Sequence, residues 1–194
     1  MIKVESCESR EKTRAGAAQA DPPGNILVLG LGNELLKDDA VGIRVAETLR
    51  ESLPSEIDVR STSLFGLSLL DELIGRDKVL LIDSYLPVDC LGADILELNV
   101  DSFGGTQASC PHFVGLAEIR EVMRSLDLGF PSEVRILAIP VSDPLTFSTE
   151  LSSEVAARVG EAAERARRIL HTWFAPAEQH AEVHPEHQLT AIKE

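Results

Sequence analysis

The chain has 194 residues, with 18 Lys and Arg against 32 Asp and Glu, which gives a formal net charge of −14. This acidic balance disfavours a nucleic-acid-binding protein, whose phosphate contacts require a basic face, and no apolar run reaches the roughly 20 residues that span a bilayer. A composition of 44% hydrophobic and 26% charged residues is that of an ordinary globular protein, and one folded domain is expected at this length.

The two ends of the chain differ in composition from its middle. Residues 1–24 mix charges with Ala, Gln and Gly, and residues 175–194 are polar, acidic and contain three of the five histidines. We therefore predict two flexible tails around a single α/β domain at residues 25–174. The N-terminal segment lacks the apolar run of a secretory signal, and the three cysteines are scattered, so the expected compartment is the cytoplasm.

Short apolar runs alternate with amphipathic segments along the predicted domain. Residues 26–30 form a continuous apolar run that ends in Gly, which is typical of a strand covered on both faces. Further β-rich runs predict strands at residues 57–62, 78–83, 95–98 and 134–139. Apolar side chains repeating every three or four residues predict helices at residues 40–53, 66–74, 116–126 and 152–174.

This alternation predicts a three-layer α/β/α sandwich around a mostly parallel, mixed sheet of five strands. The strand at residues 95–98 is expected to be antiparallel or at an edge. In such folds, ligand sites form where the strands reach their carboxyl ends. Residues 30–39 and 83–84 are therefore the first places to look for chemistry.

The first candidate site is the motif Gly-Leu-Gly-Asn-Glu-Leu-Leu-Lys-Asp-Asp-Ala-Val-Gly at residues 30–42. Its Gly-x-Gly turn suggests a dinucleotide fingerprint, but the third glycine is replaced by Leu35 and a loop separates the glycines from the next helix. A nucleotide site here is therefore only an alternative. The simplest interpretation of Asp38 or Asp39 is that one of them caps the helix that follows.

Two further side chains could join this motif in a site. Asp83 follows four apolar residues of a predicted strand, although a loop aspartate that caps a turn has the same appearance. His112 follows Pro111 and precedes a predicted helix, where a surface histidine is also common. Two carboxylates and one imidazole suit Ni, Zn, Fe or Mn, with positions left open for water or substrate. The three residues come from separate regions, so their spacing does not establish that they converge.

The motif at residues 30–42 resembles the N-terminal motif of the hydrogenase maturation endopeptidases, which trim the C-terminal extension of the large subunit of [NiFe] hydrogenases. Asp83 after its apolar strand resembles the second acidic residue of that family. The segment at residues 110–116 resembles its Pro-His segment followed by Gly-Leu, and residues 143–155 resemble its closing segment. The resemblance covers residues 25–170, nearly the whole predicted domain.

This resemblance implies that Asp39, Asp83 and His112 are the metal-binding and catalytic positions. It also implies a phosphorylase/hydrolase-like fold, a monomer, and the nickel-loaded precursor of a hydrogenase large subunit as the partner. The implied metal is nickel, which the substrate can supply, and Zn or another divalent metal suits the same residues. The first position is Glu in some relatives, and Asp38 adjoins Asp39, so the choice between the two stays open.

A second departure from the family pattern follows the second predicted strand. Relatives often have a Gly-Gly-Thr run there, whereas this chain has Thr-Ser-Leu-Phe at residues 62–65 before Gly66. If that loop shapes the substrate cleft, the departure bears on which hydrogenase is the partner.

Two mechanisms are compatible with these residues. A metal held by them could lower the pKa of a bound water, or substrate nickel could serve only for recognition while Asp39 or Asp83 acts as general base. Recognition is favoured, because carboxylate-rich sites bind nickel less tightly than thiolate sites. Two other functions remain open: a non-catalytic nickel-binding maturation chaperone with the same three residues, and a small nucleotide-binding domain at residues 30–33.

Overall fold

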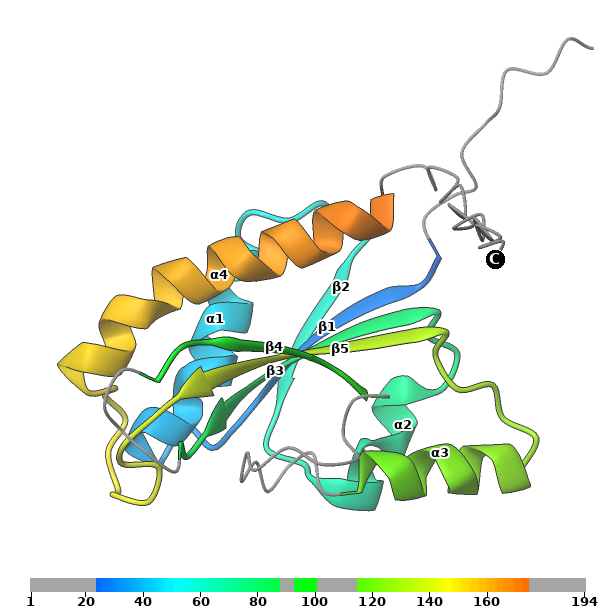
Figure 1. Cartoon of the computed structure of the whole chain (residues 1–194), viewed down its shortest axis with the longest axis horizontal. Helices are drawn as coiled ribbons and strands as arrows, with labels where there is room; N and C mark the ends of the chain where they lie inside the picture. The colour runs from blue at the N-terminus through cyan, green and yellow to red at the C-terminus, as the bar shows by residue number, and fades with distance from the viewer. Residues whose placement is uncertain (1–23, 88–92, 101–114, 175–194) are drawn as a thin grey trace, which may run out of the picture.

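The structure is a computed structural model that describes residues 24–87, 93–100 and 115–174. In this part of the chain, five strands form one sheet in the order β2-β1-β3-β5-β4 (Figure 1). The strands are β1 (Ile26–Leu31), β2 (Asp58–Thr62), β3 (Lys78–Tyr85), β4 (Leu96–Asn99) and β5 (Glu133–Pro140). All neighbours pair in parallel except β4, which lies antiparallel to β5 at an edge. The predicted mixed, mostly parallel sheet of five strands is therefore confirmed.

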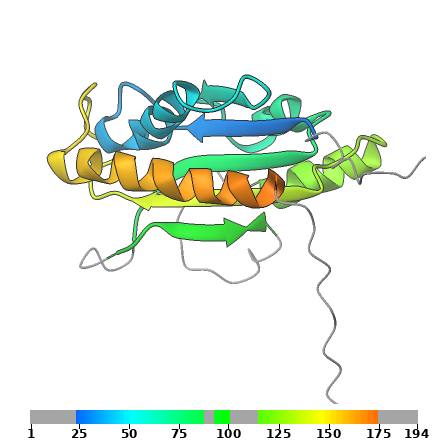
Figure 2. The ribbon, with the colours of Figure 1, turned by 90° about the horizontal axis from the view of Figure 1, so that it is seen from above.

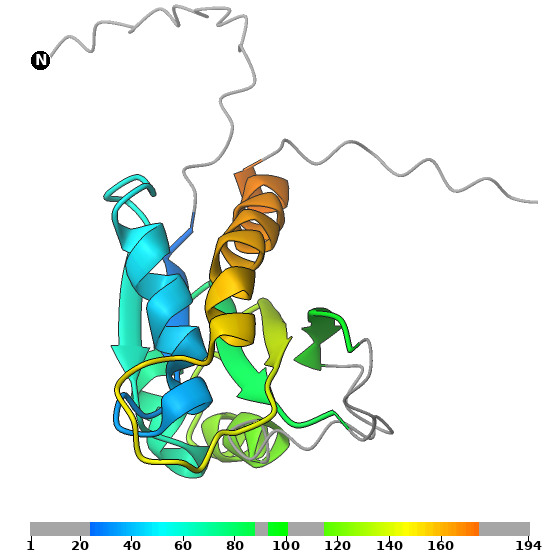
Figure 3. The same ribbon diagram turned by 90° about the vertical axis from the view of Figure 1, so that its left-hand side faces the viewer.

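Helices cover both faces of this sheet. They are η1 (Lys37–Ala40), α1 (Val41–Arg50), η2 (Gly66–Leu69), α2 (Leu70–Leu73), α3 (Leu116–Ser125) and α4 (Ser153–Phe174), where η marks a short 3-10 helix. Figure 2, seen from above, shows α4 in front of the strands. Figure 3 shows α1 and α4 side by side on one face, with α3 on the other. The three predicted layers are thus present.

The sequence of strand β1 is apolar throughout because both of its faces are buried. Leu27, Leu29 and Leu31 pack into the core shared with α2 and α3, whereas Ile26 and Val28 pack into the core shared with α1 and α4. Successive side chains of a strand point to opposite faces, so a strand covered on both faces has no solvent-facing positions. All six residues of β1 are accordingly buried.

Three glycines allow α1 to approach the sheet closely. A Cβ on Gly42 would overlap the backbone oxygens of Leu31 and Ile82, and a Cβ on Gly30 would overlap the backbone oxygen of Gly42. Gly32 has φ of +143° and would place a Cβ on the backbone oxygen of Asp39, so a larger residue is excluded there. Backbone contact between α1 and the ends of β1 and β3 therefore fixes the position of η1.

Several predicted elements differ from the observed ones at their ends. The helix predicted at residues 40–53 ends at Arg50, and the one predicted at residues 66–74 begins as a 3-10 turn and ends at Leu73. Strand β3 runs two residues beyond the predicted end, because Ser84 and Tyr85 continue its pairing with β5. Asp83 therefore lies inside a strand.

The predicted tails at residues 1–24 and 175–194 lie outside the described residues, apart from Gly24. Their flexibility and the exact domain boundaries stay predictions. None of the helices within the described ranges has the length and apolar character that crossing a bilayer requires.

Candidate active site

The order of the strands reverses direction between β1 and β3. From β1 the chain passes through α1 to β2 on one side, and it then crosses to β3 on the other side of β1. A crevice forms at the carboxyl ends of strands at such a point, and it is where ligands bind in open α/β sheets. Asp39 in η1 follows β1, and Asp83 lies near the carboxyl end of β3. Two of the three predicted site residues therefore belong to the elements that border this crevice.

The carboxylate of Asp39 is held between two elements. Its Oδ2 accepts a hydrogen bond from the backbone N–H of Asn33 at 2.8 Å, in the loop after β1. Its Oδ1 accepts a hydrogen bond from the hydroxyl of Ser84 at 3.1 Å, near the end of β3. Asp39 is only partly buried, so its carboxylate is both oriented and within reach of solvent.

Asp83 is completely buried. Its Oδ1 accepts a hydrogen bond from the backbone N–H of Ser84 at 2.7 Å. A buried carboxylate requires such partners, because taking it out of water is costly. Side chains alternate between the two faces of β3. Asp83 therefore lies on the same face as Leu81, which is covered by α2 and α3, and Ser84 lies on the face covered by α1. Ser84 is thus hydrogen bonded to both aspartates.

Ser84 lies in the segment, residues 83–84, to which the sequence pointed, but the sequence predicted no role for its side chain. The predicted strand ended at Asp83. Its position as a polar residue that continues a buried apolar run is the signal that could have identified it.

Asp38 and Asp39 are neighbours in the sequence but face different elements. Asp38 is completely buried, and its Oδ1 accepts a hydrogen bond from the backbone N–H of Ser152 at 2.7 Å, just before α4. Its Oδ2 has no hydrogen-bond partner in the described part of the chain. Asp38 therefore anchors η1 to the start of α4, whereas Asp39 faces β3.

The loop after β5 is fastened to the loop after β1. The ammonium of Lys37 lies 2.8 Å from the carboxylate of Asp143. Hydrogen bonds from Lys37 and then Thr146 lower the pKa of Asp143 from 3.8 to about 2. Backbone bonds reinforce this pair, since Lys37 donates to Ser148 at 2.8 Å and Ser148 donates to Leu35 at 3.0 Å. The two loops therefore form one rim of the crevice.

His112, the third predicted site residue, lies outside the described residues. The structure resumes at Gly115, where a Cβ would lie 3.1 Å from the Cα of Gly66. Gly66 begins η2 shortly after the carboxyl end of β2. Within the described ranges, no group of three His, Cys, Asp or Glu side chains could hold a metal ion. Asp39 and Asp83 would therefore need a ligand from elsewhere.

Known proteins are similar to this chain in sequence and in fold. No family model matches the chain. The hydrogenase 2 maturation protease of Escherichia coli K12 is 27% identical over 144 residues, which are 72% of this chain and 87% of that protein. The hydrogenase expression/formation protein HupD of Rhizobium leguminosarum bv. viciae is 24% identical over 158 residues, which are 78% of this chain and 77% of that protein.

Among solved structures, the hydrogenase maturating endopeptidase HybD of E. coli superposes with a TM-score of 0.61 at 26% identity, over 76% of this chain and 93% of its own. The hydrogenase 2 maturation peptidase of a Thaumarchaeota archaeon gives a TM-score of 0.54 at 28% identity, over 75% of this chain and 97% of its own. In sequence and fold, the chain is similar to the hydrogenase maturation endopeptidases. These relatives support a peptidase with a role in hydrogenase maturation.

An open groove lies between the loop after β1 and the end of β2. Its volume is about 700 Å³. Its lining residues come from the loop after β1, from α1 and from the end of β2: Gly32, Asn33, Glu34, Leu35, Ile43, Ser61, Thr62 and Ser63. One of these lining residues, Asn33, also donates its backbone N–H to the carboxylate of Asp39.

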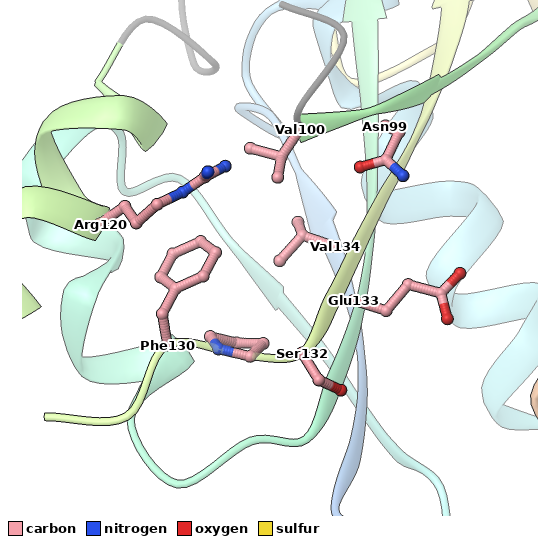
Figure 4. A pocket seen from close by; sticks show the side chains of 8 residues that line it. Asn99, Val100, Arg120, Phe130, Ser132, Glu133 and Val134 are labelled. Atoms are coloured by element: carbon pink, nitrogen blue, oxygen red, sulfur yellow. The ribbon is translucent and has the colours of Figure 1, made fainter. Parts of the chain in front are cut away.

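A second, smaller cavity, of about 190 Å³, lies at the opposite edge of the sheet. Figure 4 shows it where β5 begins and β4 ends, with Arg120 beside Phe130. The guanidinium carbon lies 5.2 Å from the ring centroid, so the two side chains form a cation–π contact. This cavity is remote from Asp39 and Asp83, and the groove at the carboxyl edge is the candidate substrate site.

Proposed function

We propose that this peptidase removes the C-terminal extension from the nickel-loaded precursor of a [NiFe] hydrogenase large subunit. The observation that carries the proposal is the pair of hydrogen bonds by which Ser84 joins Asp39 and Asp83 at the switch point of the sheet. A groove large enough for a peptide segment adjoins this pair. The hydrogenase 2 maturation protease of E. coli supports the choice of substrate through its similarity to this chain.

Asp39, Asp83 and His112 form the set that recognises the nickel in this proposal. His112 lies three positions before Gly115 in the sequence, and three positions span at most about 11 Å. Gly115 itself adjoins Gly66, shortly after the carboxyl end of β2. Two carboxylates and one imidazole suit a borderline divalent ion such as nickel, and Zn satisfies the same donors. A bound metal polarises a carbonyl and acidifies water.

We assign Asp39 to contact the substrate. We assign Asp38 to hold η1 in place. Asp39 is partly exposed beside the groove, whereas Asp38 is buried against the start of α4. As general base, the Asp39 carboxylate takes a proton from water while the water oxygen adds to the scissile carbonyl carbon. The proton then passes to the departing amide nitrogen as the peptide bond breaks.

Nickel serves mainly as a recognition signal in this proposal. Carboxylate oxygens bind nickel less tightly than thiolates or several imidazoles do, so the free enzyme is expected to hold the metal weakly. We also expect the enzyme to act as a monomer in the cytoplasm.

Both alternative functions have less support. A loop of residues 32–36 separates β1 from η1, so no helix begins at the glycines as a dinucleotide site requires. A chaperone that only binds nickel would have no need of a peptide-sized groove beside Asp39.

The test compares a nickel-loaded and a nickel-free precursor by intact mass after incubation with the enzyme. We expect loss of a C-terminal peptide from the nickel-loaded form alone. Cleavage of both forms at equal rates would overturn nickel recognition. If no matched precursor is cleaved while the protein binds nickel and releases it, the chaperone function replaces the peptidase. His112→Ala, checked for folding by circular dichroism, should abolish the loss of the peptide.

A further inference from the structure

Large hydrophobic side chains are exposed on the loops that border the crevice. Phe147 is 84% exposed, Leu145 is 76% exposed and Leu35 is 59% exposed. We call six such residues the edge patch: Leu35, Leu64, Phe65, Leu67, Leu145 and Phe147. They follow three different strands, β1, β2 and β5, yet all lie at the carboxyl edge of the sheet. A cluster of this kind on a soluble surface usually marks an interaction site.

The edge patch is continuous in the chain with the segments that line the groove. Leu35 is itself a lining residue, and its backbone carbonyl accepts a bond from Ser148, the neighbour of Phe147. A β-bridge between Leu36 and Phe147 joins the same two loops. Leu64 and Phe65 directly follow the lining residue Ser63. Exposed apolar side chains therefore accompany both segments that form the groove.

The charge of this surface is acidic. Lys37 is the one basic residue in the three loops, residues 32–37, 61–67 and 143–150, and it is paired with Asp143. Glu34 and Glu150 are exposed and take part in no ion pair in the described part of the chain. Glu34 lines the groove itself. The complementary partner is therefore both apolar and basic.

We propose that the groove and the edge patch bind an extended segment of the protein substrate that carries apolar side chains and a basic side chain, the latter beside Glu34. This inference rests on the proposed function, since it makes the bound segment a part of the precursor. A second copy of this chain fits less well, because a two-fold dimer through the patch would bring its unpaired acidic residues together.

The test measures cleavage of the nickel-loaded precursor over a range of precursor concentrations. Phe147→Ser and Leu35→Ser shorten exposed side chains, so the fold should be retained. Each substitution should raise KM about tenfold and change kcat less. The reason is that the lost apolar contact stabilises the bound substrate and the transition state equally. Leu126→Ser is the matched control: Leu126 is 60% exposed beyond the end of α3. It should leave KM unchanged.

Glu34→Lys tests the charge independently of the apolar contacts. It should raise KM about tenfold at low salt, and the difference from wild type should shrink as salt screens the groove. KM within twofold of wild type for all three patch and groove variants would overturn the inference while the proposed function stands. A wild-type enzyme that cleaves no precursor would instead overturn the proposed function and the inference with it. A wild-type dimer in sedimentation velocity that Phe147→Ser dissociates would assign the patch to self-association and also overturn the inference.

Discussion

The hydroxyl of Ser84 donates a hydrogen bond to Oδ1 of Asp39, although 45 positions separate the two residues in the sequence. The backbone N–H of Ser84 donates to Asp83 at the same time. One residue of β3 therefore orients a carboxylate that is partly exposed and another that is buried. The orientation of Asp39 depends on this hydroxyl and on the N–H of Asn33.

Ser84→Ala should lower kcat/KM for precursor cleavage about tenfold, because it removes one of the two bonds that orient Asp39 and keeps the backbone bond to Asp83. Ser84→Thr keeps a hydroxyl and should recover most of the activity. Ser125→Ala is the control, since its hydroxyl bonds only to a backbone carbonyl of α3. Equal activity of Ser84→Ala and wild type would exclude Ser84 as a positioning residue.

Replacing the two adjacent aspartates should have opposite effects on activity and stability. Asp39→Asn should reduce cleavage more than 100-fold, a loss on the order of 3 kcal/mol in transition-state stabilisation, and change the melting temperature little. Asp38→Ala removes the acceptor for the Ser152 N–H and should destabilise the fold by about 1–3 kcal/mol while cleavage persists. Thermal unfolding and the mass assay on both variants check this. Loss of cleavage by a folded Asp38→Ala, with activity kept by Asp39→Asn, would reverse the assignment.

Gly42→Ala should destabilise the protein by about 1–3 kcal/mol, because its methyl group would overlap the backbone oxygens of Leu31 and Ile82 and push α1 off the sheet. Gly160→Ala is the matched control in α4, since no atom of another described element lies within 4 Å of the added methyl group. There, alanine should stabilise the helix by about 0.5–1 kcal/mol. Urea unfolding of the two variants gives both values, and equal midpoints would contradict the close approach.

The pair of Lys37 and Asp143 should contribute to stability in a defined pH range. Because the pKa of Asp143 falls from 3.8 to about 2 on folding, the contribution is complete above about pH 4 and is lost as the pH falls through 2. The urea midpoint of wild type should therefore exceed that of Asp143→Asn at pH 6. The gap should narrow steadily below pH 4. A gap that stays constant down to pH 3 would show that the charge of Asp143 is not involved.

The sequence allowed the central sheet and the place of the site to be predicted. Buried strands covered on both faces have continuous apolar runs, which identified β1 and β3. The rule that sites form at carboxyl ends then pointed to residues 30–39 and 83–84. The family resemblance selected Asp39 and Asp83 within these segments, and neither step needed knowledge of distant contacts.

The orientation of individual side chains could not be predicted in the same way. Asp38 and Asp39 are equivalent in the sequence, and their difference arises because Ser152, 114 positions away, bonds to one of them. The edge patch was also missed, since Leu and Phe in a loop do not reveal whether another element covers them. His112 stays a prediction, because it lies outside the described residues.

The short helix η1 lies early in the domain, yet late segments hold it in place. Asp38 bonds to Ser152, and Lys37 bonds to Asp143, 106 positions further along the chain. During synthesis, both anchors would be absent until residues beyond 152 had left the ribosome. Since long-range contacts form slowly, Asp39 would reach its final position among the last events of folding. An incomplete chain would thus lack the contacts that fix η1, and with them the final position of Asp39.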